Sequence, residues 1–163
     1  MTSRDKRSGS DYEVTELDEQ QLVAMYRSSA IARKIIDLPA EDSLREWREW
    51  QAKAKVISAL ESEEARLGLQ AKMVTVSKRG RLFGGAALFI GTGEQDLAKP
   101  LDPEKIELGG LKYLTVLNRA DLIPGEIELD PREPYYSKPK SYRMHTGVAQ
   151  MEIHPSRLVL GMG

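Results

Sequence analysis

Residues 80–93, GRLFGGAALFIGTG, combine the densest glycines of this chain with a short apolar run. The run Ala86–Ile90 has glycines on both sides, a pattern typical of a buried strand. A phosphate-binding loop is the alternative, but such a loop places a strand first, then glycines, then a helix. Here the apolar run follows the glycines, and no Lys-Ser/Thr pair of a P-loop accompanies them. We therefore predict that the small residues Gly84–Ala87 let a helix lie closely over this end of the strand.

The residues before this stretch predict helices. Asp18 and Gln21 form a capping pattern, and apolar residues then recur at helical spacing: Leu22, Met25, Ala32, Ile35 and Ile36. Pro39 is expected to end this helix or to begin the next one.

A second helical piece is expected over residues 43–56, with Trp47 and Trp50 on one face. Residues 59–80 are rich in helix formers, although Gly68 weakens that prediction. The candidate inward residues of this third piece are Leu60, Ala65, Leu67 and Leu69.

The residues after the glycine stretch predict short strands separated by proline-rich loops. Strands are expected at 113–117, 141–146 and 149–161, with a hairpin turn at Gly147. Because helices come first and strands later, the order predicts an α+β domain whose N-terminal helices pack on a small, mainly antiparallel sheet. We expect one such domain over 18–163 after a polar tail at 1–17. The apolar end RLVLGMG suggests a piece of a longer protein.

The composition excludes several classes of function. The 163 residues include 24 basic and 25 acidic side chains, so no net charge of the whole chain favours nucleic acid or an anionic membrane. The chain has no cysteine, which excludes disulfides, thiolate nucleophiles and the common structural zinc sites. The sequence contains no run of about 18 apolar residues, so it predicts no membrane-spanning helix.

Two groups of residues are candidates for chemistry. Asp37, Glu41 and Asp42 cluster around Pro39 and could bind Mg²⁺, but acids also favour helix caps and first turns, which we prefer here. His154 and Ser156 match one His-x-Ser/Thr element of the two-histidine phosphoesterases, which need two such elements for general acid and general base.

The second element is not evident at the other histidine. His145 is followed by Thr146 and Gly147, which breaks the pattern. We predict that both histidines are ordinary polar residues of paired strands. No Gly-x-Ser-x-Gly elbow of a serine hydrolase occurs either.

Five cations lie among the acids of the predicted helices: Arg27, Arg33, Lys34, Arg45 and Arg48. Such residues are usually solvated and form weak ion pairs. Alternatively, Arg33 and Lys34 could support a subunit contact beside the isoleucines at 31, 35 and 36. Trp47 and Trp50 suit either a core or an interface.

Four segments, in order, resemble the N-terminal region of a group of tailed-phage and prophage portal proteins long catalogued as a domain of unknown function. They are YRSSAIARKIIDLPAEDSLREWREW at 26–50, RLFGGAALFIG at 81–91, GGLKYLTVLNRADLIPG at 109–125 and IHPSRLVLGMG at 153–163. The family pattern is similar: a helix with Tyr-Arg and Ala-Arg-Lys-Ile, then a Trp-Arg element, a Gly-Gly-Ala strand and an Ile-His-x-Ser-Arg strand. The resemblance spans residues 20–163.

The resemblance implies a structural part of a portal ring, usually a dodecamer, at one vertex of the virion capsid. Such a ring is assembled in the bacterial host cytoplasm and docks capsid, terminase and head–tail connector proteins. Double-stranded DNA is packaged and ejected through it. This chain would be the outer, wing-like part without the stem and clip, so the resemblance does not imply direct DNA contact. It implies no catalytic, cofactor-binding or metal-binding residues and no enzyme activity.

Two alternatives remain open at this point. The resemblance extends to proteins described as anti-CBASS phosphodiesterases, which destroy cyclic oligonucleotide signals of bacterial immunity, and activity of this kind would depend on His154. A small nucleic-acid-binding module is the other alternative, and it predicts steeply salt-dependent duplex binding.

Overall fold

The computed structural model describes residues 17–145 and 150–162, and it confirms the α+β class. Four helices precede six strands, and short 3₁₀ turns lie at Pro103–Lys105, Arg119–Asp121 and Pro155–Arg157. The elements are α1 (Glu19–Ser28), α2 (Ala30–Ser43), α3 (Ala54–Leu67), α4 (Leu69–Phe83), β1 (Ala86–Gly91), β2 (Tyr113–Asn118), β3 (Leu122–Pro124), β4 (Tyr142–His145), β5 (Gln150–Ile153) and β6 (Leu158–Gly161).

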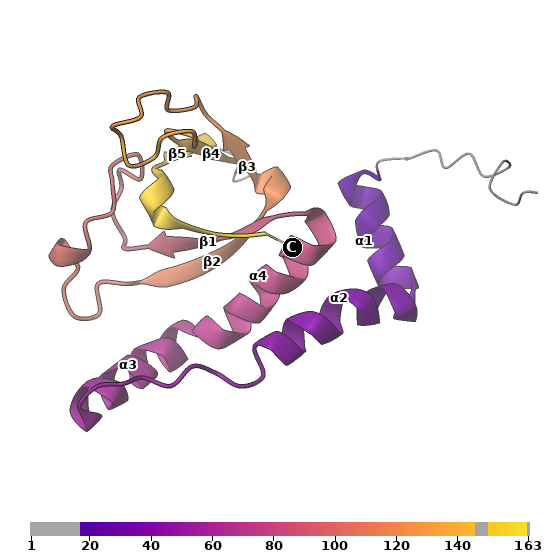
Figure 1. Ribbon diagram of the computed structural model, residues 1–163, viewed down its shortest axis with the longest axis horizontal. Coiled ribbons are helices and arrows are strands. Elements are labelled where there is room, and N and C mark those ends of the chain that lie inside the picture. Colours follow the sequence, from indigo (N-terminus) through magenta and orange to yellow (C-terminus); the bar gives the residue numbers. More distant parts are fainter. Residues whose placement is uncertain (1–16, 146–149, 163) are drawn as a thin grey trace, which may run out of the picture.

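The strands form two antiparallel sheets of three strands rather than one. The first sheet has the order β2-β1-β6 and the second has the order β3-β4-β5. Helix α4 covers one face of the first sheet, and the second sheet covers the other face (Figure 1). The domain is therefore built in three layers, with β1 in the central strand position of the middle layer.

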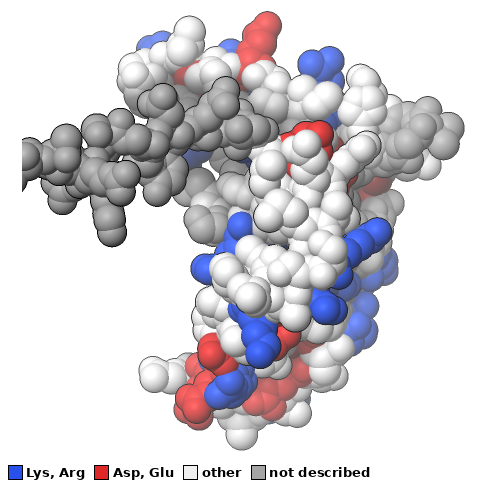
Figure 2. Space-filling model, turned by 90° about the vertical axis from the view of Figure 1, so that its right-hand side faces the viewer, with Lys and Arg blue, Asp and Glu red and all other residues white. Residues whose placement is uncertain are grey.

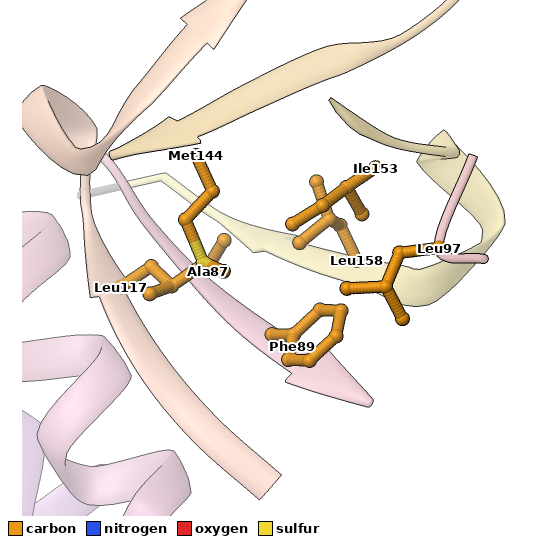
Figure 3. Packing of buried hydrophobic residues seen from close by; sticks show 7 residues of the cluster. All are labelled: Ala87, Phe89, Leu97, Leu117, Met144, Ile153 and Leu158. Atoms are coloured by element: carbon orange, nitrogen blue, oxygen red, sulfur yellow. The ribbon is translucent and has the colours of Figure 1, made fainter. Parts of the chain in front are cut away.

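This layering explains why residues 86–89, which are two alanines, a leucine and a phenylalanine, are all apolar. Ala87 and Phe89 point into the core between the two sheets, together with Leu97, Leu117, Met144, Ile153 and Leu158 (Figure 3). Ala86 and Leu88 lie in the other cluster, between the first sheet and the helices. This cluster also contains Leu114 of β2, Leu67 of α3 and Val76 of α4. A strand covered on both faces has no solvent-facing positions, so the alternation of apolar and polar residues disappears.

The predicted close packing of a helix on Gly84–Ala87 is confirmed for Ala86, which lies in the cluster with Val76 of α4, and is wrong for the two glycines. Gly84 has a φ of 76° and caps the C-terminus of α4 in the left-handed conformation, which explains its identity. A Cβ on Gly85 would lie 3.9 Å from its nearest neighbour, so no close approach needs this glycine. The glycine that a close helix requires is Gly161, where an added Cβ would lie 2.7 Å from Cγ1 of Val76 in α4.

The first predicted helix is in fact two helices. The capping box at Asp18 and Gln21 is confirmed, but the chain leaves helical geometry at Ser29, which caps α2. We call α1 and α2 together the α1–α2 arm. Because of this break, apolar residues before and after Ser29 do not share one helix face. The predicted buried stripe is therefore wrong at Met25 and Ile35, which are 51% and 59% exposed.

Pro39 neither ends nor begins a helix, because it lies inside α2. A proline leaves the carbonyl four residues earlier without its helical donor, and here that carbonyl belongs to Ile35. The guanidinium of Arg81 in α4 donates to this oxygen at 3.3 Å. A contact between helices thus replaces the lost helical bond.

The second predicted helix is wrong for residues 44–53, which are not helical. Helix α3 begins at Ala54, and Gly68, with a φ of 61°, divides the third predicted piece into α3 and α4. Ala65 is exposed rather than inward, whereas Leu67 is buried as predicted. No helix within 17–145 or 150–162 is long and apolar enough to cross a membrane.

The predicted strands at the C-terminal end are confirmed in part. Strands β4 and β5 pair antiparallel, with Tyr142 opposite Ile153 and His145 opposite Gln150. The turn expected at Gly147 lies outside the described residues. The predicted strand 149–161 is interrupted by a 3₁₀ turn after His154, and β6 then pairs with β1 of the other sheet.

Candidate interaction surface

The acids around Pro39 are held by neighbouring helices. Asp37 accepts a hydrogen bond from the Tyr26 hydroxyl at 2.8 Å, and Nζ of Lys78 lies 3.4 Å from Asp37 and 2.6 Å from Glu41. The bond to Asp37 raises the pKa of Tyr26, and the bond to Glu41 raises that of Lys78. Because these acids link α1, α2 and α4, the predicted capping role is wrong for Asp37 and Glu41. The described residues contain no group of three metal-ligating side chains.

His154 has a structural role at the corner between the two sheets. Its Nδ1 accepts from the Ser156 backbone N–H at 3.2 Å and lies 2.8 Å from the Ser156 hydroxyl. That hydroxyl accepts from the backbone of Leu101, and the imidazole meets the ring of Tyr135 edge-on at 5.4 Å. Burial, with a smaller contribution from the charge of Arg157, lowers the pKa of His154. The imidazole is therefore neutral near pH 7 and holds its turn as an acceptor.

The two histidines do not form a pair. His145 is exposed at the end of β4, opposite Gln150, with its Nε2 3.1 Å from the Gln150 side chain. His154 follows the other end of β5, four residues away, which at about 3.3 Å per residue is roughly 13 Å along the strand. A shared proton-transfer site would need both rings within hydrogen-bond reach of one substrate.

The sequence interpretation missed Arg157, which is fully buried. Its guanidinium donates to the Lys99 carbonyl at 3.0 Å and to the Thr92 hydroxyl at 3.3 Å, and it pairs with Glu94. Arg157 therefore links the loop after β1 to the turn before β6. In the sequence this cation ends the Ile-His-x-Ser-Arg element and directly precedes the apolar run LVLG, a position that also fits an exposed residue.

Residues 44–53 are attached to α3 by side chains. Trp47 and Arg48 both donate to the carboxylate of Glu64, at 2.9 Å from the indole and 3.0 Å from Nε of the arginine. The Arg48 guanidinium lies 4.3 Å from the ring centroid of Trp50, a cation–π distance. Burial opposes ionisation of Glu64, but the hydrogen bonds from Trp47 and Arg48 outweigh it and lower the pKa. Trp47 and Trp50 therefore lie in a partly buried contact between residues 44–53 and α3.

The outer face of α2 carries an apolar stripe that the described residues leave uncovered. We define the α2 stripe as Ile31, Ile35 and Leu38, which are 72%, 59% and 50% exposed. Their spacing of four and three residues places them on one helix face. Lys34 is exposed beside the stripe, whereas Arg33 is exposed on the opposite side of the helix, and neither forms an ion pair with a described acid. Figure 2 looks at the arm from its outer end, nearly along α2, and shows pale, uncharged surface at the front with basic side chains on both sides.

A hollow of about 370 Å³ lies at the other end of the helical layer, where α3 turns into α4. We call it the α3–α4 hollow. Apolar atoms line most of it and two glutamates lie at it; its residues are Trp47, Glu61, Glu64, Ala65, Gly68, Leu69, Gln70 and Ala71. Glu61 is exposed and has no ion-pair partner among the described residues, so its charge faces outward unneutralised.

Comparison with known proteins identifies the family. The profile of the family described as "Phage portal protein" matches residues 20–163. The chain belongs to the phage portal protein family.

The curated relatives are longer proteins. The chain is 39% identical over 165 residues to the Anti-CBASS protein Acb1 of Sphingomonas paeninsulae, covering 99% of this chain and 26% of that protein. It is 39% identical over 166 residues to the protein of the same name from Caulobacter sp. (strain RHG1), with the same shares. An uncharacterised protein of Haemophilus influenzae is 26% identical over 147 residues, covering 88% of this chain and 33% of that protein. The chain thus spans about a quarter to a third of these relatives.

Proposed function

We propose that this chain is a structural component of a phage portal ring, forming its outer, wing-like α+β part. In such a ring its partners are neighbouring copies of the same subunit, and the assembled ring docks capsid, terminase and head–tail connector proteins. Double-stranded DNA passes through the channel of the ring at the portal vertex of the virion. Membership of the portal family is the observation that carries this proposal, because the family match includes all six strands and all but the first residue of α1.

Two features of the surface support the proposal. The α2 stripe and the α3–α4 hollow are different surfaces, both apolar and both uncovered in the single chain. A closed ring needs two different complementary faces on each subunit, because its contacts are heterologous.

Particle mass tests the proposal. We expect native mass spectrometry and negative-stain electron microscopy to show a closed ring for a longer form that carries residues 1–163 and a portal C-terminal region. The 163-residue chain alone is expected to be monomeric or weakly associating. A longer form that folds but stays monomeric would contradict the ring function. A stable ring of the 163-residue chain would contradict the expected need for the C-terminal region.

A second candidate function is hydrolysis of cyclic oligonucleotide signals, favoured by the 39% identity to two proteins named Anti-CBASS protein Acb1. In this chain His154 and Ser156 would have to act, yet both are engaged in the corner between the sheets. Incubation of the chain with cyclic oligonucleotides is expected to give no turnover, and His154→Asn, which keeps a capping acceptor, is expected to change nothing. Turnover that this substitution abolishes would establish the second function instead.

A further inference from the structure

We infer that the α2 stripe of one subunit docks into the α3–α4 hollow of a second copy of this chain. The inference rests on the proposed ring function and goes beyond it by naming the two faces that meet. It follows from the shape, the charge and the position of the two surfaces.

The shapes fit because one surface projects and the other is concave. Ile31, Ile35 and Leu38 stand out from a helix whose opposite side is fixed to α4 by Lys78 and Arg81. The hollow is lined by small and apolar groups such as Ala65, Gly68, Leu69 and Ala71. Its volume of about 370 Å³ accommodates branched aliphatic side chains.

The charges are complementary around these apolar centres. Lys34 lies beside the stripe, and Glu61 lies at the hollow; both are exposed without an ion-pair partner among the described residues. Glu64 adds a second carboxylate, which Arg48 already neutralises in part. An interface with an apolar centre and a charged rim is the usual arrangement between subunits, and the charges chiefly set orientation and partner choice.

The positions of the two surfaces select a head-to-tail contact. In Figure 1 the α1–α2 arm lies at the right and α3 at the lower left, with α4 between them. One copy can therefore offer its stripe at one end while its hollow at the other end receives the stripe of the next copy. Contact between two stripes would instead bring the unneutralised Lys34 of both copies together, which is unfavourable.

Cysteine cross-linking tests the contact directly, because the chain has no cysteine of its own. The Ile35→Cys chain is mixed with an Ala71→Cys chain that carries a longer tag. Both are present at about 1 mM, because weak contacts are populated at this concentration. A short bis-maleimide then joins cysteines that lie close together. The matched control replaces Ala71→Cys by Tyr136→Cys, which is exposed to a similar degree as Ile35 but lies in the loop between β3 and β4.

We expect the Ile35–Ala71 heterodimer to form about tenfold faster than the control heterodimer, a preference of about 1.4 kcal/mol. Equal rates for the two pairs would overturn the inference. Preferential cross-linking of Ile35→Cys to itself would also overturn it, because that product reports a two-fold contact between stripes.

Charge reversal gives an independent result. In the cross-linking pair, Lys34→Glu on the stripe chain is expected to remove the preference, and Glu61→Lys on the hollow chain is expected to restore it. A preference that persists after reversal without the compensating change would contradict the proposed orientation. Failure of the contact is distinguishable from failure of the ring function, because a longer form can still close a ring through other faces.

Discussion

Ile153 is fully buried between the two sheets, whereas Ile31 and Ile35 of the α1–α2 arm remain exposed. The sheet region completes its core within one chain, since the faces of β1 are covered by α4 and by β3–β5. The arm completes only its inner side, through Ala40 and the contacts of Asp37, Glu41 and Ile35 with α4. The difference teaches that the sheet core is complete within one chain, whereas the arm leaves apolar area exposed, which is the basis for the contact proposed above.

The largest effect is expected at the centre of the sheet region. Ile153→Ala removes a fully buried aliphatic side chain from a packed core. We expect the free energy of unfolding to fall by about 2–5 kcal/mol, measured by urea denaturation. A loss below about 1 kcal/mol would show that the two sheets are not tightly packed against each other.

The next effect concerns the contact between α4 and the first sheet. Gly161→Ala would place a Cβ 2.7 Å from Cγ1 of the buried Val76, so we expect a loss of about 1–3 kcal/mol in urea denaturation. Gly85→Ala is the matched control, because its Cβ would meet nothing closer than 3.9 Å. Equal effects at the two glycines would show that α4 does not pack closely enough on Gly161 to exclude a side chain.

A smaller effect is expected from pH at the corner between the sheets. The pKa of His154 lies below its ordinary value of about 6.5 in the folded state, so the unfolded chain takes up the proton first as pH falls. The contribution of this group to stability is thus complete above pH 6.5 and decreases as pH drops toward the folded-state pKa. His154→Asn should make the loss of thermal stability between pH 7 and pH 5 shallower. An unchanged slope would show that the ring is not buried.

The smallest effect is expected on the arm. Ile35→Ala removes an exposed side chain, so we expect the unfolding free energy of the single chain to change by no more than about 0.5 kcal/mol. Ile153→Ala is a matched comparison, because both substitutions remove the same side-chain atoms. If urea denaturation gives similar losses for both variants, the arm packs against its own chain and the distinction between the two regions fails.

The sequence predicts the sheet region better than the helical region. The apolar run between glycines reports burial directly, and the β-rich residues at 113–117 report a strand, so β1 and β2 are found where they are expected. The division of the strands into two sheets depends on β6 pairing with β1, a contact between residues about 70 positions apart that no local pattern encodes.

The errors in the helical region have physical causes outside the local sequence. Pro39 is tolerated inside α2 because Arg81, far along the chain, supplies the missing donor. Residues 44–53 have helix-forming side chains, yet Trp47 and Arg48 bond to Glu64 of the following helix instead. Among the candidate surface residues, Arg33, Lys34 and the isoleucines were recognisable from the sequence, but the hollow was not, since it forms only where α3 turns at Gly68.

Amide hydrogen exchange on the assembled and dissociated protein tests most directly whether the arm is completed by a second copy. Exchange reports local opening, and peripheral elements with few buried contacts exchange fastest. We predict that assembly slows exchange in residues 30–43 and 59–71 and leaves β1 unchanged, because the sheet core is already complete. Unchanged exchange in both helical segments of an assembled ring, with new protection elsewhere, would contradict this account.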